Sequence, residues 1–354
     1  MTVEPRASAK AQVKVINPLE YLGWDDLIPN RLPGGFFYST AWARVLCDTY
    51  KHVPLYFCRF SGNQLTEALP VMEVSSRLTG KRGVSLPFTD SCGWLGTGGE
   101  ADAGTFEAAL EVGASRGWRY LECRGNRPNL QKDSASLVFL SHSIDLTTGS
   151  AALLERFDPS VRRAIRKAEK SSVVVTFDSD EESMRRYYAL HERTRQRHGV
   201  PPQPINFFRN IASLVFRLGK GFIATAWQHK TPIAGAVFFQ HGGDAVYKFG
   251  ASDSAFQHLR PNNLLFSEVI KRLTANGISS LQLGRTSPQN EGLRRFKLGF
   301  GAQEDELPYF RYDFSKQAFV AALDRAESGL KRLFCHFPRP LLRFTGRILY
   351  PHLS

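Results

Sequence analysis

The chain has 354 residues, of which 42% are hydrophobic and 22% charged. This composition is that of an ordinary globular protein, and it excludes disordered, collagen-like and disulfide-scaffold proteins. The length favours two domains. Lys and Arg number 46 against 33 Asp and Glu, so the net charge is +13. Such a charge favours anionic partners: nucleic acid, anionic lipid or phosphorylated metabolites.

The five cysteines are isolated and form no C-x-x-C pair, so we expect neither a disulfide framework nor a metal site. The first 14 residues lack the apolar core of a signal peptide. No run of roughly 18 uncharged apolar residues is present to form a transmembrane helix. We therefore expect a cytoplasmic protein.

In chain order, the first half begins with two strands over 55–60 and 68–74, joined by a turn. A helix over 105–116 stops at Gly117, a position that favours a left-handed glycine. A short strand over 118–123 follows it and leads directly into Arg124.

The second half repeats this order. Strands over 221–227 and 232–239 precede a helix over 263–276, which stops at Gly277 before a strand over 278–283. Arg285 follows that strand closely, as Arg124 follows its counterpart. Two copies of one α/β unit explain the pattern economically, with chance matching of common patterns as the alternative. The expected fold is α/β, with mixed sheets flanked by helices.

Between the two units, residues 141–150 read as a linker, and a basic helix over 160–170 follows it. Ser179 and Glu182 have the spacing of a capping box for a helix over 183–198. Arg163, Arg166 and two lysines share one face of the basic helix, where like charges repel each other. That face is either a phosphate contact or a solvated surface.

The segment 292–301 mixes cations and glycines with two phenylalanines, so a backbone bend there would bring Lys297 near a groove. Lys297 could then stabilise a tetrahedral intermediate or hold a phosphate, although a β-bulge or hairpin would give the same pattern. Asp90 ends an apolar segment at a Pro-Phe turn, where it could bind a ligand or cap the turn. Tyr247 and Lys248 alternate along a strand, so only one of them can face a cleft.

After residue 313 the chain becomes helical, aromatic and basic. Its seven Lys and Arg residues against Asp324 and Glu327 give this tail a net charge of +5. Basic residues interleaved with Leu, Phe and Ile are typical of a segment that lies on an anionic membrane surface. The alternative is a C-terminal helix that packs on the second domain. The expected domains are therefore 1–145, 146–313 and the tail 314–354.

Seven short motifs together resemble the Fem-like (FemAB-related) transferases of the GNAT acyltransferase superfamily, some of which accompany PEP-CTERM and exopolysaccharide systems. They run in family order from about residue 36 to residue 312: 85–90 (SLPFTD), 120–124 (YLECR), 162–168 (RRAIRKA), 198–202 (HGVPP), 232–235 (PIAG), 259–263 (LRPNN) and 292–297 (GLRRFK). The resemblance implies two tandem GNAT-like domains, in agreement with the duplication.

The resemblance also implies transfer of an acyl or aminoacyl group to an amine of a peptidoglycan or exopolysaccharide precursor. Lys297 occupies the place of the lysine thought to stabilise the transition state in Fem enzymes, and Asp90 matches a group that contacts the precursor. Weaker ligand contacts are Arg124, Arg163, Arg166, Tyr247 and Arg285. No tightly bound cofactor is implied; the co-substrate is aminoacyl-tRNA or acyl-CoA.

Two departures bear on the donor. CoA-dependent GNAT enzymes hold pyrophosphate with Gln/Arg-x-x-Gly-x-Gly/Ala, whereas residues 257–262 read QHLRPN, without either glycine. The coiled-coil arm of some Fem ligases is also missing, which weakens the case for tRNA. The alternatives are therefore a CoA-dependent N-acyltransferase and a non-enzymatic protein that binds anionic surfaces. No DNA-reading module is recognisable.

Overall fold

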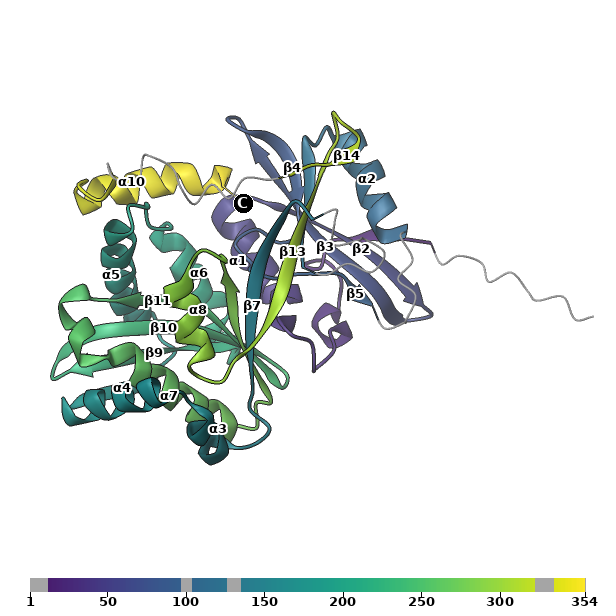
Figure 1. The fold of residues 1–354 in the computed structure, drawn as a ribbon. Helices are drawn as coiled ribbons and strands as arrows, with labels where there is room; N and C mark the ends of the chain where they lie inside the picture. Colours follow the sequence, from purple (N-terminus) through teal and green to yellow (C-terminus); the bar gives the residue numbers. More distant parts are fainter. Residues whose placement is uncertain (1–11, 97–103, 126–134, 322–333, 354) are drawn as a thin grey trace, which may run out of the picture.

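A computed structural model describes residues 12–96, 104–125, 135–321 and 334–353. In these ranges the chain forms one continuous mixed sheet with helices on both faces, which confirms the predicted α/β fold (Figure 1). Among the described residues, no helix is long and apolar enough to cross a membrane.

The first half supplies six strands and two α-helices. Their bounds are β1 (Lys14–Ile16), α1 (Thr40–Tyr50), β2 (Val53–Ser61), β3 (Gln64–Ser76), β4 (Gly80–Val84), β5 (Leu95–Gly96), α2 (Gly104–Arg116) and β6 (Tyr120–Arg124). Short 3-10 turns at Trp24–Leu27 and Gly35–Tyr38 precede α1.

The remaining elements come in this order: β7 (Leu137–Asp145), α3 (Ser150–Arg156), α4 (Pro159–Lys170), β8 (Val173–Asp178), α5 (Glu181–Arg197), α6 (Ile205–Leu214), β9 (Gly221–Gln228), β10 (Thr231–His241), β11 (Asp244–Ser252), α7 (Pro261–Ala275), β12 (Ser280–Thr286), α8 (Glu291–Leu298), β13 (Gln303–Asp313), β14 (Ala318–Phe319) and α10 (Arg339–Leu349).

The internal duplication is confirmed. Each half begins with an antiparallel hairpin, β2–β3 or β9–β10, to which a third antiparallel strand adds. In each half that third strand then pairs in parallel with a strand reached through a helix: β4–α2–β6 and β11–α7–β12. Gly117 (φ 70°) and Gly277 (φ 75°) end the two crossover helices in the left-handed conformation that the sequence predicted.

The two halves are joined by strands that cross between them. The sheet order is β1-β2-β3-β4-β6-β13-β7-β12-β11-β10-β9-β8, so β13 pairs with β6 while β7 pairs with β12. Figure 1 shows β7 and β13 side by side through the middle of the molecule. The predicted linker over 141–150 is therefore wrong in its first part, because residues 137–145 form a central strand. The domain boundaries stay predictions.

Three large apolar cores and one small cluster, formed by Phe139, Leu307 and Tyr309, pack on this sheet in the described residues. The largest is shared by the two halves: Trp42 of α1 contacts Phe207 of α6 and Phe239 of β10, with ring centroids 5.9 and 5.6 Å apart. A second core lies under α3, α4 and α7, and a third lies under α2. Because one core spans both halves, residues from each half are held in fixed positions at the junction.

Two local predictions need correction. Asp180, not Ser179, caps α5, since its carboxylate accepts a hydrogen bond from the Ser183 N–H. Residues 291–298 form the helix α8, capped by Asn290, and not a hairpin or β-bulge. The backbone N–H groups at the start of a helix need a hydrogen-bond acceptor, and the short polar side chains of Asp180 and Asn290 supply one.

Candidate active site

The loop after β4 places Asp90 at the junction of the two halves. Leu86 (φ 53°) and Phe88 (φ 59°) take up the left-handed conformation, which costs about 1–3 kcal/mol at each non-glycine residue. The Arg124 guanidinium donates hydrogen bonds to the carbonyls of Leu86 and Thr89, 3.4 and 3.0 Å away. Arg124 thus holds a strained loop in the shape that presents Asp90.

Asp90 faces cations from the second half of the chain. Lys248 Nζ on β11 lies 3.1 Å from Asp90 Oδ2, and Arg285 Nε lies 3.9 Å from Oδ1. Burial alone would raise the pKa of the Asp90 carboxyl, but Lys248, Arg285 and Lys297 together hold that pKa below its usual range. Asp90 is therefore an ionised carboxylate at neutral pH.

Lys297 lies beneath this cluster on α8. It is 2% exposed, and its Nζ donates hydrogen bonds to the carbonyls of Gly284 (2.8 Å) and Arg285 (3.2 Å). Burial lowers the pKa of Lys297 to about 8, against the opposing effect of Asp90. The two carbonyls use two N–H groups, so the charged form has a third to donate.

The cluster is open on one side. The side chains of Asp90 and Arg285 are 24% and 40% exposed, whereas that of Lys248 is 6% exposed. Arg285 lies over the rings of Phe139 (4.3 Å) and Tyr309 (5.4 Å), which fix its guanidinium at the opening. Three cations around one carboxylate leave a positive site that a ligand can reach through Asp90 and Arg285.

Gly284 allows this arrangement. Its φ is +70°, and a Cβ atom there would lie 2.7 Å from Asp90 Oδ2. We expect Gly284→Ala to lower the free energy of unfolding by about 2 kcal/mol, because it adds left-handed strain and displaces the carboxylate. Chemical denaturation measures this. Gly292→Ala is the matched control: its Cβ meets nothing closer than Asn290 Oδ1 at 4.0 Å, so it should not destabilise. Equal losses in both variants would contradict the role given to Gly284.

Of the residues predicted from the sequence, the structure brings Asp90, Arg285 and Lys297 together. Arg124 lies beside them but is 5% exposed, and its N–H groups bind Glu122 and the loop carbonyls. It positions the loop. Tyr247 packs on Phe238 and Phe266, on the other face of the sheet from Lys248.

Sequence reasoning chose Tyr247 over its neighbour Lys248, which is wrong, and it missed Tyr309 and His142. A bulge between Val237 and Phe238 shifts the β10–β11 register opposite Lys248, and it is this lysine that contacts Asp90. The Tyr309 hydroxyl donates a hydrogen bond to the Asp90 carbonyl from β13. Of Lys248, Tyr309 and His142, only Lys248 had a signal in the sequence, which is the alternation of side chains at residues 247 and 248 along a strand.

His142 lies behind Lys297 on β7. Its side chain is buried, and its Nε2 is 3.0 Å from Glu304 Oε2. Burial and the nearby Lys297 lower the pKa of His142, although Glu304 opposes them. His142 is therefore uncharged at neutral pH and adds no further positive charge beside Lys297.

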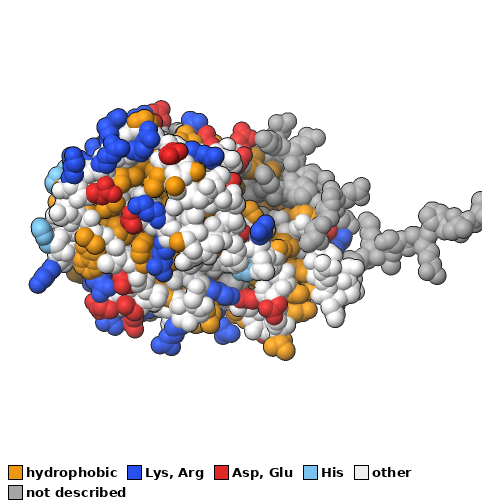
Figure 2. Space-filling view, turned by 90° about the horizontal axis from the view of Figure 1, so that it is seen from below, with side chains coloured by type: hydrophobic (Ala, Val, Ile, Leu, Met, Phe, Trp, Pro, Cys, Tyr) orange, Lys and Arg blue, Asp and Glu red, His pale blue; other side chains and the backbone are white. Residues whose placement is uncertain are grey.

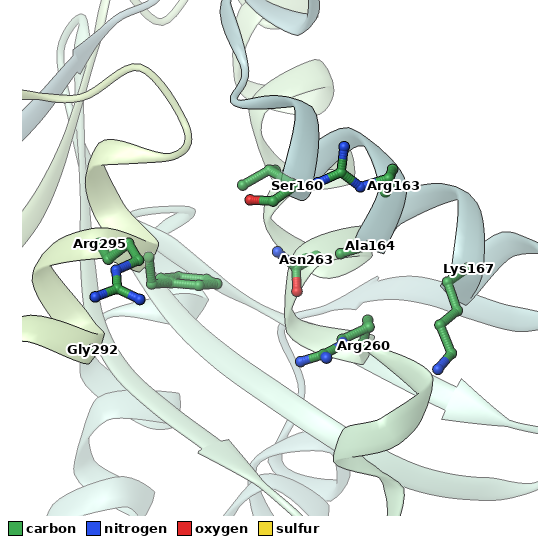
Figure 3. A pocket seen from close by; sticks show the side chains of 10 residues that line it. Ser160, Arg163, Ala164, Lys167, Arg260, Asn263, Gly292 and Arg295 are labelled. Atoms are coloured by element: carbon green, nitrogen blue, oxygen red, sulfur yellow. The ribbon is translucent and has the colours of Figure 1, made fainter.

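A basic groove of about 510 Å³ lies between α4, α7 and α8, on the same helix α8 that carries Lys297. Figure 3 shows Arg163 on α4 and Arg260 before α7 extending toward one space, with Arg295 of α8 on its other side. Lys167 also lines the groove. The helix N-terminus of α7 opens into it, which favours anions.

Arg260 takes up a left-handed conformation (φ 59°) and is the N-cap of α7. This is the position at which the CoA-binding pattern has its first glycine. The backbone thus keeps a glycine-like turn while an arginine side chain lines the groove, at a conformational cost of about 1–3 kcal/mol.

The predicted basic face of α4 divides into two parts. Arg163 and Lys167 line the groove, whereas Arg166 is exposed on the helix and is not part of the groove lining. Figure 2 views the molecule from the side of α3, α4 and α7, and Lys and Arg side chains gather at its upper left edge.

In the described parts of the chain, no three His, Cys, Asp or Glu side chains lie close enough to hold a metal ion.

Comparison with known families gives one match: residues 156–311 fit the acetyltransferase (GNAT) domain. Residues 156–311, within the second half of the chain, are thus a GNAT-like domain. It contains α4, α7, α8, the groove and Lys297. The protein is therefore an acyltransferase. No curated protein matches the sequence.

Solved structures extend this likeness beyond the GNAT domain. FemX superposes with a TM-score of 0.67 at 15% identity, covering 86% of this chain and 98% of FemX. The C-terminal domain of a putative lysylphosphatidylglycerol synthetase from Agrobacterium fabrum has a TM-score of 0.54 at 14% identity, covering 81% and 89%. A tandem GNAT protein from the clavulanic acid biosynthesis pathway has 0.53 at 11%, covering 89% and 100%. The fold around the GNAT domain is thus that of the Fem-like, tandem GNAT proteins.

Proposed function

We propose that the protein transfers an acyl or aminoacyl group from a phosphate-bearing donor to an amine on an anionic cell-envelope precursor of the peptidoglycan or exopolysaccharide class. The observation that carries the proposal is the open cluster at the junction, where Asp90 from the first half meets Lys248, Arg285 and Lys297 from the second. A site built by both halves can hold a donor and an acceptor together.

In the proposed reaction the acceptor amine attacks the activated carbonyl carbon of the donor. A C–N bond forms, and negative charge develops on the carbonyl oxygen. The Lys297 ammonium stabilises that oxyanion with its third N–H. The C–S or C–O bond to the donor then breaks, the amine nitrogen loses a proton, and the leaving thiolate or alkoxide takes one up. Asp90 orients the amine by accepting its hydrogen bond.

The donor's phosphates would bind in the groove between α4 and α7. Arg163, Arg260 and Lys167 supply cations that can bind phosphate oxygens, and the positive end of the α7 helix dipole adds to them. Pro261 at the first helical position has no N–H, and the Asn263 N–H donates to the Arg260 carbonyl, so side chains supply most of the donors. Acyl-CoA is the donor that this groove favours, because acyl-CoA contains a pyrophosphate and the groove offers the compact set of cations that a pyrophosphate needs. Aminoacyl-tRNA is the alternative that the sequence resemblance to the Fem-like transferases implies.

The excess of cations around Asp90 favours an acceptor that carries negative charge beside its amine. Both FemX and the lysylphosphatidylglycerol synthetase domain share this fold. This likeness supports a cell-envelope acceptor, and we place the reaction at the cytoplasmic face of the membrane.

Thermal unfolding in the presence of candidate donors tests the proposal. A donor at about 100 times its dissociation constant should stabilise the protein by roughly 2.7 kcal/mol. We expect a saturable shift with acyl-CoA; a shift with charged tRNA alone would reassign the donor. Arg163→Ala should weaken donor binding about tenfold and so reduce the shift at a given donor concentration, whereas Arg166→Ala, on the same helix but outside the groove, should keep it. No shift with either donor would contradict the proposal.

Arg260→Gly separates donor binding from stability. Glycine relieves the left-handed strain, so we expect the free energy of unfolding to stay constant or rise by about 1 kcal/mol. Donor affinity should fall by about tenfold, because one phosphate contact is lost. Denaturation and donor titration of the same variant measure both. Unchanged affinity would show that the Arg260 side chain does not contact the donor.

A further inference from the structure

The C-terminal helix α10 is fixed to the second half along one face. Leu342 is 1% exposed, and a Cβ at Gly346 would lie 2.0 Å from the Pro202 carbonyl. Arg343 donates hydrogen bonds from its Nε and Nη2 to the two carboxylate oxygens of the buried Glu192 on α5. The chain end is also tied to the first half, since Arg82 Nη2 donates to the His352 carbonyl at 2.8 Å. Figure 1 shows α10 lying along the edge of the molecule above α5.

The opposite face of α10 is apolar and exposed. Leu341, Phe344 and Ile348 are 44%, 61% and 46% exposed, and their spacing of three and four residues aligns them in one stripe along the helix. Leu353 is 45% exposed just beyond the helix. Four of the thirteen large hydrophobic side chains exposed in the described parts of the chain thus fall within 341–353. Scattered single residues would need no explanation, but a stripe on a rigidly held helix does.

Positive charge lies beside and behind the stripe: Arg347 flanks Phe344 on the helix surface, whereas Arg339 and Arg343 lie on the side of α10 that contacts α5. α10 contains three arginines and no carboxylate, and the last turns of α5 beside it add three more: Arg193, Arg195, Arg197, Arg339, Arg343 and Arg347. Among the described residues, Glu192 pairs with Arg343 and Asp253 pairs with Arg193, so the six arginines and these two carboxylates have a net charge of +4. The contact from Gln196 Nε2 to the Phe337 carbonyl (3.0 Å) holds the two helix ends together.

We propose that this face of α10 docks the protein on an anionic membrane surface. A stripe of three side chains is small against the roughly 1,000 Å² that a stable protein interface needs. A lipid surface needs only a shallow apolar insertion with arginines beside it at headgroup level. The helix packs on α5 and docks outward at the same time, so the two roles considered for the tail are compatible. Lys331 and Arg332 lie outside the described residues.

Co-sedimentation with vesicles tests the proposal and does not depend on the acyl-transfer reaction. The full chain should sediment with phosphatidylcholine–phosphatidylglycerol vesicles and not with phosphatidylcholine alone. Phe344→Ser/Ile348→Ser should weaken binding at least about tenfold, and Arg347→Gln about fivefold. Leu218→Ser is the matched control, since Leu218 is 60% exposed on a distant 3-10 turn and should leave binding unchanged.

Three results would overturn the proposal: no binding of the full chain to anionic vesicles, equal binding by Phe344→Ser/Ile348→Ser, or equal losses with Leu218→Ser. Sedimentation equilibrium tests the other partner that could bind the stripe, a second copy of this chain. A dimer that Phe344→Ser/Ile348→Ser dissociates, with no vesicle binding, would assign the stripe to a second copy of this chain. Thermal unfolding of each variant confirms that α10 and the fold around it persist.

Discussion

Lys297→Met is expected to lower the transfer rate about 10²- to 10³-fold, the usual loss when one oxyanion donor is removed. Methionine fills the volume of the lysine stem but cannot donate to a developing oxyanion. We expect little change in stability. Removing the buried amine should stabilise the fold, because burial opposes its charged form. Losing its hydrogen bonds to the carbonyls of Gly284 and Arg285 should destabilise the fold. The two effects on the free energy of unfolding therefore oppose each other. Steady-state kinetics with denaturation of the same sample measures both.

The pH dependence identifies Lys297 more specifically. Because its pKa is about 8, the stabilising ammonium is present below that pH and is lost as the pH rises through it. The transfer rate should therefore show a descending limb near pH 8. Lys297→Arg keeps its charge throughout this range, so any activity it retains should lack the limb. A rate unaffected by Lys297→Met, or an identical limb in both proteins, would rule out this role.

Asp90→Ala is expected to destabilise the fold by about 3 kcal/mol, because it leaves the Lys248 ammonium buried without its carboxylate. Burial already lowers the pKa of Lys248 against the effect of Asp90, so removing the carboxylate should lower that pKa further. The penalty in the variant should then shrink as the pH rises, since the lysine can lose its proton. Denaturation at several pH values measures this dependence.

The double variant Asp90→Ala/Lys248→Met is the control for that interpretation. With neither charge present, much of the lost stability should return, while acceptor binding and transfer should stay impaired because Asp90 is missing. Glu181→Ala breaks an ion pair that is 56% exposed, and because water screens that pair it should leave stability essentially unchanged. A double variant as unstable as Asp90→Ala would show that the carboxylate is needed for the loop conformation and not for Lys248.

The sequence predicts the repeated part of the fold well. Two hairpins and two crossover helices ending at Gly117 and Gly277 depend on local patterns, and each appears at the expected place. Asp90 and Lys297 were selected from short motifs, and the structure places both at the junction. Local turn and capping chemistry is readable because the residues that decide it are neighbours in the chain.

What the sequence does not predict depends on distant contacts. Residues 137–145 mix polar and apolar side chains and read in part as a linker; they form a strand because β13, about 160 residues later, pairs with them. Lys248 reaches Asp90 at a bulge whose existence depends on the packing of β10 against β11. The basic groove needs α4, α7 and α8 to meet, which no local pattern encodes.

One measurement tests the central claim most directly: transfer of a labelled acyl group from acyl-CoA and from charged tRNA to amine-bearing envelope precursors, followed by mass spectrometry for wild type and Lys297→Met. We predict an amide product with the wild type, and a rate lower by about 10²-fold or more with Lys297→Met. Absence of an amide product with both donors, or equal rates in the two proteins, would contradict acyl transfer at the Asp90–Lys297 cluster.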